Sequence, residues 1–348
     1  MHLSDFDFNL PEELIAQTPL EKREDSRLMV VDRAAHSITH RRFVDILDYF
    51  AHQPLLVLNN TQVMPARLLG HYKGTEKRVE LVLVEETTNA TWRALVKGLA
   101  RMKPGQVLEF SDEKNRLQAV FLGPHEGMGT FRLECSGNLH ATLEALGLPP
   151  LPPYIKRPER NPATDLLDRE RYQTVFASVP GAIAAPTAGL HFSAELLERV
   201  QEMTDTAFLT LHVGTGTFQP IRVEEVESHV MTKEYYRIPA ETWNRVVESK
   251  RDGRKVLAVG TTSTRVLESV NFGEMSGKAV SGWTDRFLYP GQAFLNVDQL
   301  LTNFHLPRST LFLLVCAFAG KPLMDQAYTE AVAEGYRFFS YGDAMLIL

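Results

Sequence analysis

The sequence predicts an α/β protein into which a second, all-β domain is inserted. Three observations support this prediction. Short β-type segments follow one another closely between Met64 and Cys135, β- and α-type segments alternate before and after that region, and prolines mark both of its borders. We therefore expect a discontinuous α/β domain at residues 1–64 and 150–348, with a mixed, partly parallel sheet, and a small antiparallel β-barrel domain at residues 65–149.

The first part of the α/β domain contains two short apolar runs. Residues 28–31 (LMVV) and 55–58 (LLVL) are continuous hydrophobic stretches of strand length. Such runs are typical of strands that are buried on both faces of a parallel sheet. We therefore expect the α/β sheet to begin before the insertion.

The inserted region contains five expected strands, at residues 79–84, 92–96, 107–110, 117–122 and 130–135. The sequences between them carry the Gly, Pro, Asn and Asp residues of tight turns, as in KPG at 103–105 and SDEKN at 111–115. Several short strands joined by turns predict a small antiparallel barrel.

Strands and helices alternate again after the insertion. We expect strands at residues 208–213 and 255–259, and helices at residues 194–202, 240–250 and 324–334. Ser193 should cap the first helix, and Gly253 and Gly335 should end the other two. Residues 157–171 combine prolines with mixed charges, which predicts an exposed or mobile loop.

The composition is that of an ordinary globular protein, with 44% hydrophobic and 23% charged residues. The N-terminus has neither the basic nor the apolar segment of a signal peptide. The longest apolar run, residues 311–319, falls short of the about 20 residues of a membrane span. Cys135 and Cys316 form neither a metal-binding pair nor a disulfide framework. We expect a cytoplasmic monomer without membrane contact.

The most informative segment is residues 184–192 (AAPTAGLHF). Pro186 and Gly189 disfavour both helix and strand, and the helix expected from residue 194 follows at once. Thr187 and His191 are therefore expected on a tight loop at a helix entrance, where free backbone N–H groups collect. Loops held by a rigid scaffold commonly carry chemistry.

Residues 259–265 (VGTTSTR) are expected to pass from a strand into a helix. Their hydroxyls and free N–H groups predict an anion site, to which Arg265 can add a charged contact. A well-capped turn without a ligand would contain the same residues, so both interpretations stay open. The lone Gly214-Thr-Gly216 lacks the third glycine of a dinucleotide fingerprint, and Pro220 interrupts the helix that should follow, which argues against nicotinamide binding.

Three histidines, His191, His212 and His305, lie in strings rich in Gly, Thr or Pro. A lone histidine is most often structural, but with three in such strings we expect at least one to act as an acid or a base. The chain contains no His-Glu-x-x-His and no paired-cysteine motif that would indicate zinc.

The whole chain closely resembles the S-adenosylmethionine:tRNA ribosyltransferase-isomerases of queuosine biosynthesis. The resemblance rests on the strings above and on residues 10–17 (LPEELIAQ), 58–67 (LNNTQVMPAR), 171–175 (RYQTV), 211–220 (LHVGTGTFQP), 301–307 (LTNFHLP) and 338–343 (FFSYGD). It implies that the ribosyl part of S-adenosylmethionine is transferred to a 7-aminomethyl-7-deazaguanine base in tRNA and isomerised. The products are epoxyqueuosine-tRNA, adenine and methionine. It also implies that no metal or redox cofactor takes part, because S-adenosylmethionine is consumed as a substrate.

The implied chemistry needs a base for a C5′ hydrogen beside the sulfonium, and an acid for the departing adenine. We assign these catalytic roles to His191 and His212, with Asp343 orienting one of them or facing the sulfonium. The residues that we expect to bind substrate are Tyr172, Thr187, Thr262, Arg265, Asn303 and His305.

A net charge of −6 argues against a general nucleic-acid binder, although a local basic surface remains compatible with it. The segment from Thr87 to Leu108 has no acidic residue and four basic ones. We expect the tRNA to contact these four, Arg93, Lys97, Arg101 and Lys103. A solvated strand face and loop is the alternative interpretation.

Two other functions remain open. An S-adenosylmethionine-dependent methyltransferase would release S-adenosylhomocysteine rather than adenine, and the chain lacks the early Gly-rich strand–loop–helix usual in that class. A non-enzymatic RNA-binding protein would bind tRNA through the barrel without consuming S-adenosylmethionine. That interpretation leaves the hydroxyl-rich loops of the larger domain unexplained.

Overall fold

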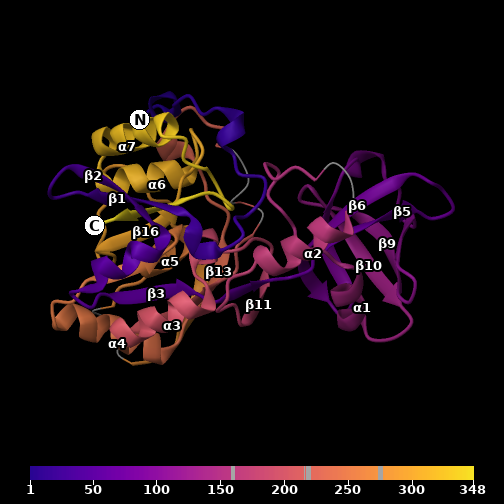
Figure 1. Cartoon of the computed structure of the whole chain (residues 1–348). Coiled ribbons are helices and arrows are strands. Elements are labelled where there is room, and N and C mark those ends of the chain that lie inside the picture. The colour runs from indigo at the N-terminus through magenta and orange to yellow at the C-terminus, as the bar shows by residue number, and fades with distance from the viewer. Residues whose placement is uncertain (158–160, 215, 217–220, 273–276) are drawn as a thin grey trace. The chain divides into compact units, whose positions relative to one another are not determined.

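The computed structural model describes residues 1–157, 161–214, 216, 221–272 and 277–348. The chain divides into two compact units (Figure 1). The first consists of Met1–Gln62, Pro152–Pro158 and Arg171–Leu348, and the second of Val63–Leu151 and Glu159–Glu170. A mixed sheet with helices forms the first unit and a closed antiparallel barrel the second, which confirms the predicted fold class.

The strands outside the barrel are β1 (Arg27–Asp32), β2 (Ser37–Arg42), β3 (Leu55–Asn59), β4 (Thr61–Val63), β11 (Val179–Ala182), β12 (Thr206–Leu211), β13 (Glu234–Ile238), β14 (Val256–Val259), β15 (Val280–Thr284), β16 (Gln299–Asn303) and β17 (Ala344–Ile347). The α-helices of this unit are α3 (Ala194–Met203), α4 (Ala240–Arg251), α5 (Thr261–Leu267), α6 (Thr310–Ala319) and α7 (Lys321–Ala333). Its shorter 3-10 helices are η1 (Leu3–Phe6), η2 (Glu12–Leu14), η3 (Arg23–Asp25), η4 (Phe43–Phe50), η6 (Thr187–His191) and η8 (Val226–Ser228).

The large sheet has the strand order β15-β13-β12-β3-β14-β16-β17-β1-β2. Strands β12, β3, β14 and β16 run parallel in its centre, so their carboxyl ends meet at one edge. Antiparallel strands extend the sheet on both sides, with β13 and β15 beyond β12 and β2 beyond β1. Ligands of open α/β sheets bind beyond the carboxyl ends of the strands.

Helices cover both faces of this sheet. Successive residues of a strand point to opposite faces, so Leu55 and Val57 of β3 join one hydrophobic core and Leu56 and Leu58 the other. The first core includes residues of α4, α5, α6 and α7, of which α6 and α7 lie side by side (Figure 1). The second core includes residues of η4, η6 and α3. Burial on both faces explains the continuous apolar run of β3.

The barrel has the strand order β10-β7-β6-β5-β8-β9. Its elements are β5 (Arg67–Tyr72), β6 (Arg78–Thr88), β7 (Thr91–Val96), η5 (Leu99–Arg101), β8 (Val107–Ser111), β9 (Arg116–His125), β10 (Met128–Cys135) and the following helix α1 (Leu139–Leu146). The five expected strands are present. Sequence analysis missed β5, because Gly70 and His71 interrupt its apolar pattern.

Residues 162–171 form helix α2 (Pro162–Arg171), where the sequence predicted a loop. Asn161 begins the helix: its side chain accepts from the Ala163 N–H at 3.0 Å, and its carbonyl from the Asp165 N–H at 2.9 Å. The Arg169 guanidinium donates to carbonyls at the end of α1, including that of Glu144. This contact explains why α2 groups with the barrel, whereas the sequence analysis placed it in the α/β domain. Residues 158–160 lie outside the described residues.

No bounds were predicted for two further helices, α5 and α6. Helix α5 begins at Thr261, one residue after β14, which agrees with the predicted passage from strand to helix, and the hydroxyl residues form its first turns. The apolar run at 311–319 belongs to α6, whose N-cap Ser309 accepts a hydrogen bond from the Phe312 N–H at 3.1 Å. In the part of the chain that the structure describes, no helix is both long and apolar enough to cross a membrane.

Gly70 of β5 approaches β8 closely, and a Cβ at this position would lie 2.1 Å from the Glu109 carbonyl oxygen. We expect Gly70→Ala to lower the free energy of unfolding by about 1–3 kcal/mol, because the two strands must separate to admit a methyl group. Leu122→Ala, at an exposed position of the same barrel, should change it by less than about 0.5 kcal/mol. Urea denaturation measures both, and equal effects would contradict the close approach.

Candidate active site

Asn59, the last residue of β3, ties the central strands together at their carboxyl ends and is 1% exposed. Its Nδ2 donates to the Leu211 carbonyl at 3.0 Å and to the Thr262 hydroxyl at 3.2 Å. Its Oδ1 accepts from the backbone N–H groups of Leu211 and Thr61, at 3.0 and 3.1 Å. One buried amide therefore fixes the end of β12, the start of α5 and the start of β4.

A cavity of about 400 Å³ opens beyond these strand ends. Segments that are far apart in the sequence line it: residues 153–154, 172, 184–188, 213, 260–262, 302–303, 305–311 and 339–340. The cavity therefore lies where the fold predicts a ligand, at the carboxyl ends of β14 and β16.

Five of the six residues predicted to bind substrate line this cavity, namely Tyr172, Thr187, Thr262, Asn303 and His305. The sixth, Arg265, is not among the lining residues. Its guanidinium forms a buried ion pair with Glu234 and donates to the Arg286 carbonyl at 3.0 Å.

Glu234 also accepts a hydrogen bond from the Gly214 N–H at 2.9 Å. The Arg265–Glu234 pair thus holds the entry to the Gly214–Gly216 segment. Within and after that segment, Thr215 and residues 217–220 lie outside the described residues.

Two buried polar atoms at the cavity, the Tyr172 hydroxyl and Asn303 Oδ1, make no hydrogen bond within the described residues. The amide nitrogen of Asn303 is engaged, because it donates to the Phe339 carbonyl and to His191 Nε2, both at 3.0 Å. Burial raises the pKa of Tyr172, so its hydroxyl stays protonated and can donate. An unpaired buried polar atom costs about 1–3 kcal/mol, which a polar ligand would recover.

Of the three candidate histidines, His305 is the one that lines the cavity. Its backbone N–H donates to the Tyr328 hydroxyl at 3.0 Å, and its Nε2 lies 2.8 Å from the Thr302 hydroxyl. Burial lowers the pKa of His305 to about 3. The imidazole is therefore neutral near pH 7.

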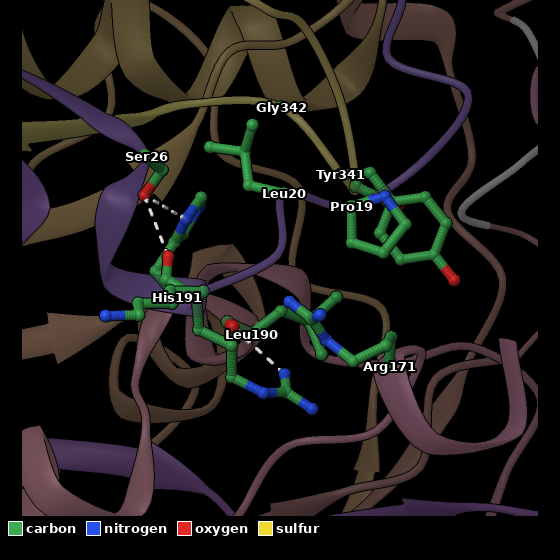
Figure 2. A pocket seen from close by; sticks show the side chains of 11 residues that line it. Pro19, Leu20, Ser26, Arg171, Leu190, His191, Tyr341 and Gly342 are labelled. Atoms are coloured by element: carbon green, nitrogen blue, oxygen red, sulfur yellow. Dashed lines mark hydrogen bonds between the residues drawn. The ribbon is translucent and has the colours of Figure 1, made fainter. Parts of the chain in front are cut away.

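His191 lies behind Asn303, at the end of η6. Its Nε2 accepts from the Asn303 amide, so its Nδ1 carries the proton and donates to the Ser26 hydroxyl at 2.9 Å (Figure 2). Burial, together with the charges of Arg23 and Arg337, lowers the pKa of His191 to about 3. His191 lines the hollow shown in Figure 2, and its hydrogen bond to Asn303 connects it to the cavity.

His212 directly follows Leu211, the last residue of β12, whose backbone is hydrogen-bonded to Asn59. Its Nδ1 lies 2.8 Å from the Thr61 hydroxyl, and its ring stacks on Tyr235 with the centroids 6.1 Å apart. The backbone at Gly181 touches the ring, since a Cβ there would lie 2.6 Å from a ring carbon. Burial lowers the pKa of His212. The neighbouring Val213 lines the cavity, whereas His212 is not among its lining residues.

The Asp343 carboxylate is 1% exposed and is bonded to the backbone. It accepts from the N–H groups of Arg27 at 2.9 Å and Arg337 at 2.8 Å, which joins β1 to the segment before β17. Burial raises the pKa of Asp343. It does not line the cavity. Within the described residues, no cluster of three or more His, Cys, Asp or Glu side chains is arranged to hold a metal ion.

Sequence analysis did not identify Arg308 and Tyr154 as site residues, yet both line the cavity. Arg308 has a left-handed backbone conformation (φ 55°), and its side chain pairs with Asp7. The ring of Tyr154 packs on Phe339 with the centroids 4.2 Å apart. The proline string before Tyr154 and the Leu-Pro before Arg308 signal irregular backbone, but neither signals a ligand.

The four basic residues predicted to contact tRNA all lie on the barrel unit. Arg93 of β7 forms an ion pair with Glu85 at 3.2 Å. Lys97, Arg101 and Lys103 are exposed around η5. Three of the four therefore present their charge to solvent, as the prediction requires.

Comparison with known proteins gives matches along the whole chain. The family model described as "Queuosine biosynthesis protein" matches residues 3–347. The curated S-adenosylmethionine:tRNA ribosyltransferase-isomerase of Acetivibrio thermocellus is 47% identical over 350 aligned residues that cover 100% of both chains. The crystal structure of the S-adenosylmethionine tRNA ribosyltransferase of Thermotoga maritima is 36% identical, covers 99% of this chain and 100% of its own, and has a TM-score of 0.56.

The buried neutral histidines predict a pH-dependent stability. The pKa of about 3 of His191 and of His305 lies below the 6.5 of a free histidine, so the unfolded chain binds more protons between these values. The free energy of unfolding should therefore fall as the pH is lowered from about 7 to about 5, by up to about 1.4 kcal/mol per pH unit for each histidine.

Urea denaturation across this pH range measures the effect. His305→Gln should make the decrease smaller, while His52→Gln, at an exposed position, should leave it as in the wild type. A wild-type stability that does not change with pH would contradict two buried neutral imidazoles.

Proposed function

Since the chain belongs to the queuosine-biosynthesis family of S-adenosylmethionine:tRNA ribosyltransferase-isomerases, we propose that its acceptor is the 7-aminomethyl-7-deazaguanine base of tRNA. The ribosyl part of S-adenosylmethionine becomes bonded to the amine of this base and isomerises to an epoxycyclopentanediol, giving epoxyqueuosine-tRNA. Adenine and methionine leave, and one proton is released overall.

Membership of the family supports the acceptor, and the charge of the cavity is the structural observation that supports S-adenosylmethionine as the ribosyl donor. Among the described residues that line the cavity, Arg308 is the one charged side chain, and the others are apolar, hydroxyl, amide or neutral imidazole groups. A single cation suits a ligand with one carboxylate, whereas a nucleotide di- or triphosphate would require several. S-adenosylmethionine has one carboxylate, and its sulfonium would meet no buried cation here.

We assign the methionine carboxylate to the mouth of the cavity. Arg308 is partly exposed there, and Thr310 and Leu311 of the first turn of α6 line the same wall. The N–H groups of a first helical turn and a guanidinium both favour an anion. This assignment replaces Arg265, whose ion pair with Glu234 is buried; the ion pair of Arg308 with Asp7 is exposed, so a ligand carboxylate can compete for Arg308.

The adenine is assigned to the aromatic wall of Tyr154 and Phe339, which offers a stacking face. Asn303 Oδ1 would accept from the exocyclic amine of adenine, and the Tyr172 hydroxyl would donate to a ring nitrogen. Donation to that nitrogen favours departure of the base. The two unpaired atoms of the cavity would thus gain partners.

Proton transfer at C5′ is assigned to His305. The sulfonium acidifies the adjacent hydrogens, and transfer of one to the imidazole leaves a neutral ylide beside an imidazolium. The sulfonium loses its positive charge as the imidazole gains one, so the net charge in the cavity does not change. Burial lowers the pKa of His305 because it disfavours adding a charge to the cavity. It therefore opposes this proton transfer less than it opposes protonation of His305 by water. The same imidazolium can later return its proton to adenine.

The catalytic roles assigned from the sequence to His191, His212 and Asp343 remain predictions. His191 is suited to position Asn303, because their hydrogen bond fixes the amide. His212 contacts Thr61, which shares Asn59 with the cavity residue Thr262. The cytoplasmic location, the monomeric state and the lack of need for a metal or redox cofactor also remain predictions.

Product analysis tests the proposed reaction. The protein is incubated with S-adenosylmethionine and with tRNA that carries either 7-aminomethyl-7-deazaguanine or guanine at the acceptor position. Equal release of adenine and methionine with the modified tRNA alone would support the proposal. Release of S-adenosylhomocysteine would indicate a methyltransferase, and tRNA binding without consumption of S-adenosylmethionine would indicate an RNA-binding protein.

His305→Gln should lower kcat by about 10²- to 10⁴-fold, the usual contribution of an acid–base group, while binding of S-adenosylmethionine persists. His52→Gln, at an exposed position, should retain the wild-type kcat. His191→Gln and His212→Gln complete the series under the same assay. Near-normal turnover of the His305 variant, with turnover lost in the other two, would restore the original assignment to His191 and His212.

The barrel cations should determine how salt affects tRNA binding. Each lost phosphate contact should flatten the slope of log affinity against log salt concentration by about 0.7 to 0.9. We expect this change for Lys97→Ala and for Lys103→Ala, and twice the change when both are replaced. Lys114→Ala, in an exposed turn of the same barrel, is the control. An unchanged slope in the double variant would place the tRNA phosphates elsewhere.

A further inference from the structure

An aromatic row crosses three neighbouring strands at one edge of the large sheet. It consists of His212 at the end of β12, Tyr235 of β13 and Trp283 of β15. Tyr235 and Trp283 are paired in register, and their rings meet edge to face with the centroids 5.7 Å apart. The ring of His212 stacks on Tyr235 at 6.1 Å.

The outer end of this aromatic row faces solvent. Trp283 is 65% exposed, whereas the other two tryptophans, Trp92 and Trp243, are 6% and 1% exposed. An indole ring that is fixed against a second ring but open on one side exposes apolar surface that a ligand can cover. The packing of Trp283 against Tyr235 keeps that surface in place before any ligand arrives.

Two cations flank Tyr235, the ring on which the exposed indole packs. Lys233 and Arg237 are both exposed, and each lies two residues from Tyr235. Because side chains along a strand alternate between the two faces, those of Lys233 and Arg237 lie on the same face as Tyr235. Asp285, two residues beyond Trp283, is the acidic neighbour. The row therefore combines ring surface with an excess of one positive charge, which suits an aromatic group attached to an anionic backbone.

The inner end of the row reaches the cavity through three polar residues. His212 contacts the Thr61 hydroxyl at 2.8 Å, and the N–H of Thr61 donates to Asn59 at 3.1 Å. Asn59 in turn donates to Thr262, which lines the cavity. A nucleic acid that covers the row would thus lie next to the wall of the proposed S-adenosylmethionine site.

We propose that this aromatic row is a stacking platform for an unpaired nucleobase of the tRNA loop that carries the acceptor base. The inference rests on the proposed function, because it identifies the surface that receives the acceptor strand at that same site. Unpaired bases of RNA loops are recognised by stacking on aromatic side chains, with cations at the phosphates. Trp283 supplies the stacking face, and Arg237 and Lys233 are placed to contact the backbone.

A protein partner fits this surface less well. A stable protein interface buries about 800 Å² on each side, whereas a tryptophan side chain supplies about 150–250 Å². The strand positions that flank Trp283 are the small Ser281 and the charged Asp285, not further apolar residues. One planar group is therefore the better match.

Tryptophan fluorescence tests the platform directly, because Trp283 is the one exposed tryptophan of the three. The probe is an anticodon stem-loop RNA with guanine at the acceptor position, titrated without S-adenosylmethionine. The wild type should show quenched emission on binding. Trp283→Phe should remove the quenching but keep most of the affinity, and Trp283→Ala should weaken binding about 5- to 100-fold. Leu295→Ala, which is 75% exposed, is the matched surface control.

Unchanged affinity of Trp283→Ala, or an emission of Trp283 that the RNA does not alter, would overturn the inference. Steady-state assays give a second readout, in which Trp283→Ala should raise KM for the modified tRNA more than it lowers kcat. Since the binding titration needs no ribosyl transfer, the two proposals fail separately. Normal product release with normal RNA affinity of Trp283→Ala contradicts only the platform, whereas quenching without product release contradicts only the reaction.

Discussion

Buried asparagine amides, at the points where parallel strands end, are the constraint on which the site depends. A strand end leaves backbone N–H and C=O groups without sheet partners, and burying them unpaired costs free energy. Asn59 satisfies both backbone groups of Leu211 and also binds Thr262. Asn303, at the end of β16, binds the Phe339 carbonyl and His191. Because each amide joins several segments, the walls of the cavity have one defined arrangement.

The same construction keeps the cavity almost free of charge. Two buried carboxylates, Glu234 and Asp343, are engaged by Arg265 and by backbone N–H groups. His191 and His305 are buried as neutral rings. A weakly polar interior of this kind suits chemistry in which a positive charge moves from sulfur to nitrogen without a fixed counter-ion. In the proposed reaction it would also favour the neutral form of the attacking amine, as nucleophilic attack requires.

Local sequence signals predicted most of the fold and several of the residues that line the cavity. The apolar run of β3 and the cap at Ser193 depend only on neighbouring residues, and both are present in the structure. The strand β5 was missed because Gly70 breaks its pattern, although that glycine is required by the close approach of β8. Arg265 of α5 was assigned to a ligand because its partner Glu234 lies 31 residues away in the sequence, on β13. Arg308 was missed because the sequence does not show that its side chain lines the cavity.

A crystal structure with S-adenosylmethionine bound is the most direct test of this account. The ligand is expected to occupy the cavity beyond β14 and β16, with its carboxylate at Arg308 and its adenine amine at Asn303 Oδ1. His305 is expected to be the histidine nearest to C5′. A ligand bound in the hollow beside His191 and Arg171, or against His212, would contradict this placement.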